Sequence, residues 1–104
     1  MTGNRWVTYG GRMKDVFRAV ADPIRRALID ELRERNDQSL FELCTRLMSG
    51  RGIHVTRQAV SKHLAVLREA GLLSIDRAGR TSIHHLNSLP LNELRDWLDR
   101  KETP

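Results

Sequence analysis

Apolar side chains recur at every third or fourth residue in five stretches of this chain, which is the spacing of amphipathic helices. Three of the helix starts carry capping signals, one of which is Thr56 before the fourth helix. Asp22 is followed by Pro23, and Ser39 is followed by Glu42 at the spacing of a capping box. The polar residues 36–38 break the pattern between two helices. The predicted helices cover residues 12–20, 22–35, 39–49, 56–70 and 88–100.

After the fourth helix the apolar period changes from helical to alternating. Leu73 and Ile75 alternate with polar residues, and Ala78-Gly79 makes a turn before a second alternating stretch. This pattern predicts a two-stranded hairpin over residues 73–86. The expected fold class is therefore mainly α with a small two-stranded hairpin.

The size and composition are those of one small globular domain: 104 residues, 39% hydrophobic and 30% charged. Residues 1–11 show no apolar period, so we expect a flexible arm followed by a domain over residues 12–101. No apolar run is long enough to cross a membrane, and the N-terminus has no signal-peptide core. We therefore expect a cytoplasmic protein without a membrane partner.

The positive charge is concentrated in one part of the chain. The net charge is +5, and residues 51–85 hold six basic and two acidic residues, which gives that segment +4. A segregated excess of this kind favours a polyanionic partner such as nucleic acid.

The third and fourth predicted helices, joined by a short turn, have the arrangement of a helix-turn-helix unit. The fourth helix has a polar face whose arginine and glutamine side chains suit guanine and adenine edges, and its N-terminus offers amides to a phosphate. Arginines flank the hairpin turn, where a wing reaches the DNA backbone or the minor groove. The candidate residues for binding double-stranded DNA are Thr56, Arg57, Gln58, Ser61, Lys62, His63, Arg77 and Arg80. For His63, half-buried packing and a phosphate contact are both more consistent with its position than a catalytic base.

Three segments, ADPIRRAL at 21–28, TRQAVSKHLAVL at 56–67 and EAGL at 69–72, resemble the ArsR/SmtB family of winged helix-turn-helix transcriptional regulators. The similarity extends over residues 13–97. It implies a winged helix whose recognition helix is 56–70 and whose wing is 73–86. The segment 56–67 is most similar to members that lack metal sites and lie beside genes for START-like proteins.

The resemblance also implies a homodimer. Family members are usually repressors that pair through their first and last helices, here residues 12–20 and 91–100, and bind a roughly palindromic operator. Trp97 is then expected at the dimer interface.

One segment departs from the family pattern, because the turn over residues 48–55 is several residues longer than usual. Gly50-Arg51-Gly52 either lengthens the third helix or places Arg51 on a phosphate. The sequence leaves the angle between the two helices open. Arg25 and Arg26 are also open between phosphate contacts and pairing with acids of the second helix.

Neither metal site of the family's sensors has its ligands here. The third helix carries Cys44 alone, with Arg46 two residues later, and the last helix offers Asp96 and Asp99 without a histidine. Cys44 lies on the apolar stripe and is expected to be a buried structural thiol. The adjacent histidines 84 and 85 point to opposite faces of a strand, one inward and one to solvent. We expect no metal and no cofactor.

An enzyme is not expected, because the chain has no glycine-rich phosphate loop, nucleophile elbow, metal motif or acid pair. Two alternatives stay open. The first is a metal- or small-molecule-responsive repressor of the same fold. The second is a protein-interaction module that docks a partner on its end helices and does not bind specific DNA.

Overall fold

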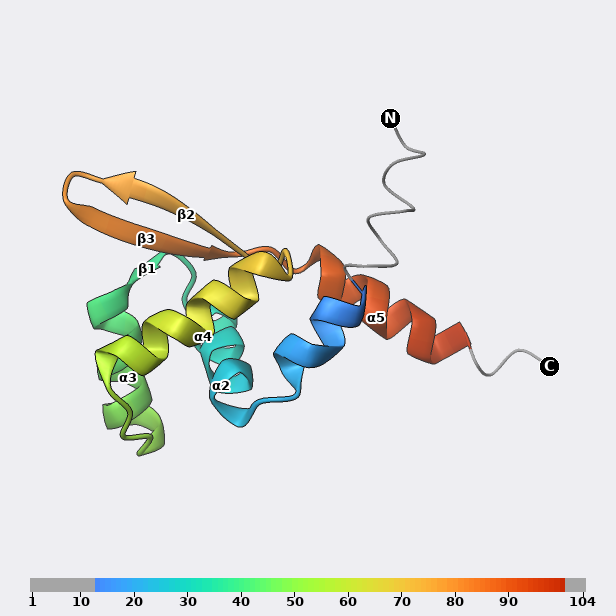
Figure 1. Ribbon diagram of the computed structural model, residues 1–104, viewed down its shortest axis with the longest axis horizontal. Helices are drawn as coiled ribbons and strands as arrows, with labels where there is room; N and C mark the ends of the chain where they lie inside the picture. The colour runs from blue at the N-terminus through green and yellow to red at the C-terminus, as the bar shows by residue number, and fades with distance from the viewer. Residues whose placement is uncertain (1–12, 101–104) are drawn as a thin grey trace.

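The structure, a computed structural model, describes residues 13–100. Within this range the chain is mainly helical, as the sequence predicts (Figure 1). None of the described helices has the length and apolar character needed to cross a bilayer. The predicted arm, residues 1–11, lies outside the described residues. A first helix, described over residues 13–20, is followed by α2 (Pro23–Glu34), β1 (Gln38–Ser39), α3 (Leu40–Arg51), α4 (Arg57–Glu69), β2 (Leu73–Ala78), β3 (Thr81–Leu86) and α5 (Leu89–Arg100).

The described sheet has three antiparallel strands in the order β1-β3-β2, so the expected two-stranded hairpin gains an edge strand. Gln38 pairs with His84 and Ser39 pairs with Ile83. The interpretation of residues 36–38 as a plain break was therefore wrong at Gln38. A two-residue strand is too short to show an alternating period, and its pairing depends on a partner 46 residues away.

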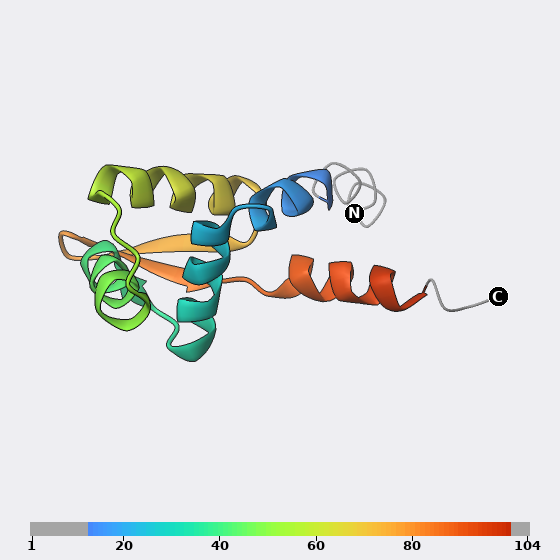
Figure 2. The same ribbon diagram turned by 90° about the horizontal axis from the view of Figure 1, so that it is seen from below.

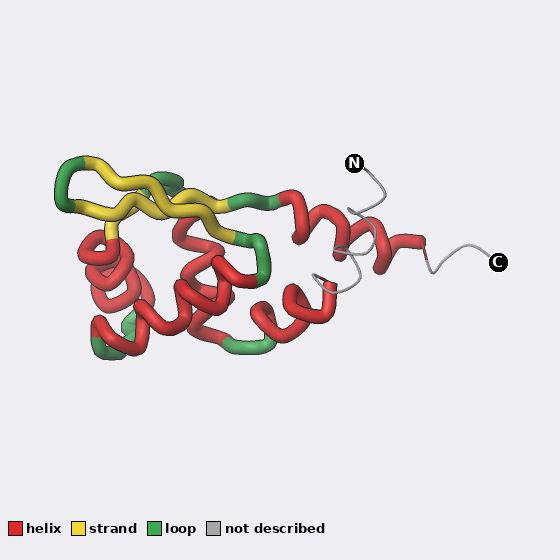
Figure 3. Tube along the Cα trace, turned by 45° about the horizontal axis from the view of Figure 1, so that its top comes forward, coloured by secondary structure: helices red, strands yellow, loops and turns green. Residues whose placement is uncertain are grey.

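Helices lie on one side of the sheet (Figure 3), and the core lies between that side and α2, α3 and α4. These three helices contact one another, and α4 also packs on β2. Leucines dominate the buried set, as the helical stripes predict. The largest fully buried apolar side chains are Leu28, Leu32, Leu43, Leu47, Leu67, Leu72, Val16 and Val60.

Helix α3 begins as predicted and ends later than predicted. The Ser39 hydroxyl accepts the amide of Glu42 at 3.1 Å, and the Glu42 carboxylate accepts the amide of Ser39 at 2.8 Å, which completes the capping box. The helix continues to Arg51 and ends at Gly52, whose φ is 66°. The long segment after Met48 is thus partly an added length of helix, and the turn into α4 covers residues 52–56.

The Asp-Pro-x-Arg-Arg segment joins α2 to the end of the first helix. One carboxylate oxygen of Asp22 accepts the amides of Ile24 and Arg25, at 2.8 and 3.0 Å. The guanidiniums of Arg25 and Arg26 turn back and donate to backbone carbonyls of residues 18–20, which would otherwise be unpaired at a helix C-terminus. Among the described residues these arginines cap the first helix and make no ion pair with an acid of α2, and their contact with a phosphate stays a prediction.

Helix α5 extends away from the other described elements, beside the first helix (Figures 1 and 2). Its only fully buried described residue is Pro90. Trp97 meets Phe17 of the first helix edge to face, with ring centroids 6.0 Å apart. Phe17, Trp97 and Leu98 keep 44%, 50% and 45% of their surface exposed. The apolar side of α5 is therefore largely uncovered by residues 13–100.

Candidate nucleic-acid interface

Helix α4 buries one face and exposes a polar one. The Thr56 hydroxyl caps the helix by accepting the amide of Ala59 at 3.0 Å. Val60, Leu64 and Leu67 are buried on the side that faces α2 and α3. The opposite face presents the predicted side chains to solvent: Arg57, Gln58, Ser61, Lys62 and the small Ala65. A row of this kind on a convex helix is free to enter the major groove.

The hairpin of β2 and β3 supplies a second exposed pair of cations. Arg77 pairs with Ser82 across the hairpin, and Gly79, with φ 66°, makes the turn together with Arg80. Both arginines are exposed. Figures 1 and 2 place the tip of this hairpin and the N-terminal end of α4 at the same end of the molecule, opposite to α5.

The cations at this end are not neutralised by neighbouring acids. Within residues 13–100, no ion pair joins a carboxylate to Arg57, Lys62, Arg77 or Arg80. Unpaired exposed cations attract polyanions over long range and release counterions on binding.

His63 lies apart from the exposed row. Its side chain is 20% exposed, and its Nδ1 accepts a hydrogen bond from Arg25 at 3.0 Å, with a carboxylate oxygen of Asp22 3.8 Å away. Hydrogen bonds from the amides of α2 outweigh the effect of burial and hold the pKa of Asp22 below its ordinary value. Of the two roles expected for His63, packing fits these contacts, because the ring connects α4 to the start of α2.

Comparison with known proteins agrees with this geometry. A family model described as a helix-turn-helix domain matches residues 20–75. The HTH-type transcriptional regulator YuzN of Bacillus subtilis is 41% identical over 86% of this chain and 98% of its own length. The chain belongs to the ArsR/SmtB family of winged helix-turn-helix transcriptional regulators.

Two further relatives support the assignment to the ArsR/SmtB family. The transcriptional repressor SmtB of Mycobacterium tuberculosis is 35% identical over 69% of this chain and 48% of its own length. The solved structure of an ArsR-like regulator from Rhodococcus sp. RHA1 superposes with a TM-score of 0.72 and 33% identity, over 88% of this chain and 80% of that one. In ArsR/SmtB terms, α4 is the recognition helix and β2–β3 is the wing.

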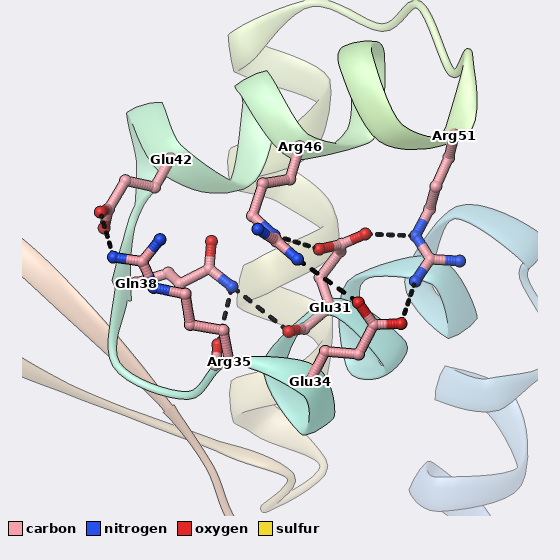
Figure 4. A network of polar contacts seen from close by, with 7 residues as sticks. All are labelled: Glu31, Glu34, Arg35, Gln38, Glu42, Arg46 and Arg51. Atoms are coloured by element: carbon pink, nitrogen blue, oxygen red, sulfur yellow. Dashed lines mark hydrogen bonds and ion pairs between the residues drawn. The ribbon is translucent and has the colours of Figure 1, made fainter.

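Arg51 belongs neither to the exposed row of α4 nor to the wing. It lies at the end of α3 and pairs with Glu31 and Glu34 of α2, as does Arg46 (Figure 4). Of the two roles expected for the long segment, lengthening the helix is confirmed. The Arg51 guanidinium pairs with Glu31 and Glu34, and its contact with a phosphate stays a prediction. Sequence reasoning missed this pairing, although acids three residues apart on one helix and arginines five apart on the next were a usable signal.

Cys44 is half-buried on α3 and packs against the core. Burial raises the pKa of its thiol, and the nearby charge of Arg57 only partly offsets this. The thiol is therefore protonated and poorly reactive at neutral pH. No three His, Cys, Asp or Glu side chains among residues 13–100 converge on a point where a metal ion would bind.

The two adjacent histidines of β3 divide as predicted, with one inside and one toward solvent. His84 is buried, and its Nδ1 lies 2.9 Å from the carbonyl oxygen of Gln38. His85 lies between two carboxylates: Nδ1 contacts Asp37, and Nε2 is 3.0 Å from Asp76. His85 thus ties the base of the wing to the loop before β1.

Proposed function

We propose that this ArsR/SmtB regulator is a homodimeric repressor that binds a roughly palindromic operator in double-stranded DNA. The observation that carries the proposal is the set of unpaired cations on α4 and on the wing tip, gathered at one end of the molecule. The relative from M. tuberculosis is named a repressor, which supports the same direction of control. Such a protein would work in the cytoplasm, with the DNA that it binds.

The proposed roles follow from exposure and chemistry. Arg57 and Gln58, on the first turn of α4, read base edges, and Ser61 and Lys62 extend the contact by one turn. Thr56 and the first amides of α4 bind a phosphate. His63, on the half-buried side of the same helix, holds α4 against the start of α2 through its hydrogen bond with Arg25. Arg77 and Arg80 bind the backbone or the minor groove from the wing.

Dimer formation is proposed from the uncovered face of α5. Leu94, Trp97 and Leu98 lie on one side of this helix, and Phe17 of the first helix adjoins them. A second copy of the chain would cover this apolar surface. It would also present two recognition helices to half-sites about 34–36 Å apart.

The test is fluorescence anisotropy of the purified protein on its own promoter region and on a scrambled duplex, over a series of salt concentrations. Arg57→Ala and Gln58→Ala should each cost about 1–3 kcal/mol on the operator and much less on the scrambled duplex. Arg80→Ala should weaken binding to both duplexes and lower the salt slope by about 1. Arg33→Ala, which removes an exposed arginine of α2, is the control and should leave the salt slope unchanged.

The proposal fails if the wild type binds both duplexes equally at physiological salt, or if Arg57→Ala and Arg80→Ala behave alike on both. Equal binding would leave only a basic surface. A protein-interaction module that uses the apolar side of α5 would then be the better description.

A further inference from the structure

Four charged side chains connect α2 to the end of α3, and we refer to them as the ion-pair cluster: Glu31, Glu34, Arg46 and Arg51. Each arginine donates through Nε to one carboxylate oxygen of Glu31. Each also reaches Glu34 through Nη2, at 3.3 Å for Arg46 and 3.4 Å for Arg51 (Figure 4). Two acids and two bases are thus matched in number and joined at four points.

The cluster is centred on a buried carboxylate. The side chain of Glu31 is 4% exposed, whereas that of Glu34 is 60% exposed. Burial alone would raise the pKa of Glu31, but the hydrogen bonds from Arg46 and Arg51 outweigh it and lower that pKa. Removing one guanidinium partner from a buried carboxylate strongly destabilises the folded protein, because the buried charge is left without full compensation. The position of both arginines is therefore fixed by Glu31.

Leu47 is the last buried residue of α3. Residues 48–50 are exposed, and a glycine inside a helix weakens it. Arg51, the last residue of the helix, is the residue that returns to α2. This last part of α3 is also the part that departs from the short turn of the family.

The recognition helix starts a few residues further on. The amides of Gly52 and Ile53 donate to the carbonyls of Met48 and Leu47, at 3.1 and 2.9 Å, so the turn begins in a fixed direction. Ile53 and Val55 then pack against the core. The place where α3 ends consequently determines where the first turn of α4 lies.

We propose that Glu31, Arg46 and Arg51 are positioning residues for DNA recognition. They hold the added length of α3 on α2, so that the turn presents Arg57 and Gln58 at one fixed place in the major groove. The inference rests on the proposed function, because it assumes that α4 reads bases. Under this proposal Arg46 and Arg51 make no phosphate contact, although both contribute to the net positive charge of the chain.

The experiment compares Arg51→Gln with Arg33→Gln. Both variants lose one arginine charge, but Arg33 is exposed on α2 and lies outside the ion-pair cluster. Anisotropy on operator and scrambled duplexes is measured over a salt series, and the folded fraction is measured by circular dichroism. Arg51→Gln should lose roughly tenfold in operator affinity per folded molecule, with scrambled-duplex affinity and salt slope unchanged. Arg33→Gln should match the wild type.

Two results would overturn the inference. A salt slope lowered by about 1 on both duplexes would make Arg51 a phosphate contact. If Arg51→Gln binds the operator as tightly as the wild type per folded molecule, the ion-pair cluster contributes to stability and does not position α4. If Arg51→Gln does not fold, Arg51→Lys replaces it, since lysine keeps the charge but has no planar group to join two carboxylates.

A second readout keeps this test separate from the proposed function. Hydrogen exchange at the amides of Gly52 and Ile53, which donate to carbonyls of α3, should be faster in Arg51→Gln than in Arg33→Gln, with or without DNA. Faster exchange together with no operator preference in the wild type would overturn the proposed function, and with it the role in DNA recognition, but would show that Arg51 holds the turn in place. Equal exchange in the two variants would overturn the positioning role.

Discussion

At the scale of single residues, the side chains that matter most here have partners on two different elements. His85 is the clearest titratable case, with Asp37 before β1 on one side of its ring and Asp76 of β2 on the other. The hydrogen bond to Asp37 is the main reason that the pKa of His85 lies above its ordinary value of 6.5, and the charges of both aspartates add to it. The charged imidazolium therefore stabilises the folded state.

The sign of the pH dependence follows from that raised pKa. The stabilisation by His85 is fully present below the unfolded-state pKa and is lost as the pH rises through the folded-state pKa. Thermal unfolding of the wild type and of His85→Gln should thus differ most near pH 5.5 and converge towards about pH 9. His84→Gln is unsuitable as a control, since His84 is buried. A difference that stays constant over this range would contradict the bridging role.

Residue-level predictions succeeded where both partners are close in sequence. The Ser39–Glu42 capping box and the Thr56 cap each join residues three apart, so local spacing was enough to find them. The bond between Arg25 and His63 joins residues 38 apart, and the pairing of Arg51 with Glu31 joins residues 20 apart. Such pairs depend on helix packing, which one sequence does not determine.

At the scale of elements, the end of α3 offers a matched pair of glycines. Neither Gly50 nor Gly52 has an atom within 4 Å of the place that a Cβ would occupy, so only backbone conformation separates them. Gly52 has φ 66°, which costs a residue with a Cβ about 1 kcal/mol, whereas Gly50 is helical. Gly52→Ala should therefore lower the free energy of unfolding by about 1 kcal/mol.

Gly50→Ala should raise the same free energy by about 0.5–1 kcal/mol, because alanine is the better helix former. Urea unfolding of both variants and of the wild type gives the two values under one condition. Equal effects of the same sign would mean that α3 does not end at Gly52.

Strongly periodic elements were predictable, and short or extended ones were not. The helices and the wing follow from apolar spacing, and the hairpin turn lies one residue later than expected, at Gly79-Arg80. Strand β1 has two residues and no period of its own, so it exists only because β3 offers an edge. The last two residues of α3, Gly50 and Arg51, were missed because they are exposed and carry no apolar signal.

At the scale of the whole molecule, the two ends have different chemistry. The end with the wing tip and the start of α4 carries unpaired cations, and the other carries the exposed apolar residues of α5. The net charge of residues 51–85 indicated the basic end from the sequence, but that sum included Arg51. In the structure that charge is matched by Glu31. Sequence alone does not separate a free cation from a neutralised one.

Dimer formation through α5 is tested by placing one acid on either side of that helix. Leu98→Asp puts a charge on the apolar side, and Asn92→Asp puts the same charge on the opposite, exposed side. Light scattering after size exclusion should give a dimer for the wild type and for Asn92→Asp. Leu98→Asp should dissociate at roughly ten- to a hundredfold higher concentration than they do. A Leu98→Asp dimer as tight as the wild type would place the interface elsewhere.

The guanidinium of Arg25 has a consequence for the whole molecule. It donates to the carbonyls of Arg18 and Ala19, at 3.1 and 2.8 Å, and to the ring of His63 at 3.0 Å. The helix that carries Phe17, beside α5, and the helix proposed to enter the major groove therefore share one side chain. A molecule that shifts the first helix must disturb the bond that holds the recognition helix from behind. By thermodynamic linkage, that molecule and the DNA would then alter each other's affinity by the same factor, without meeting.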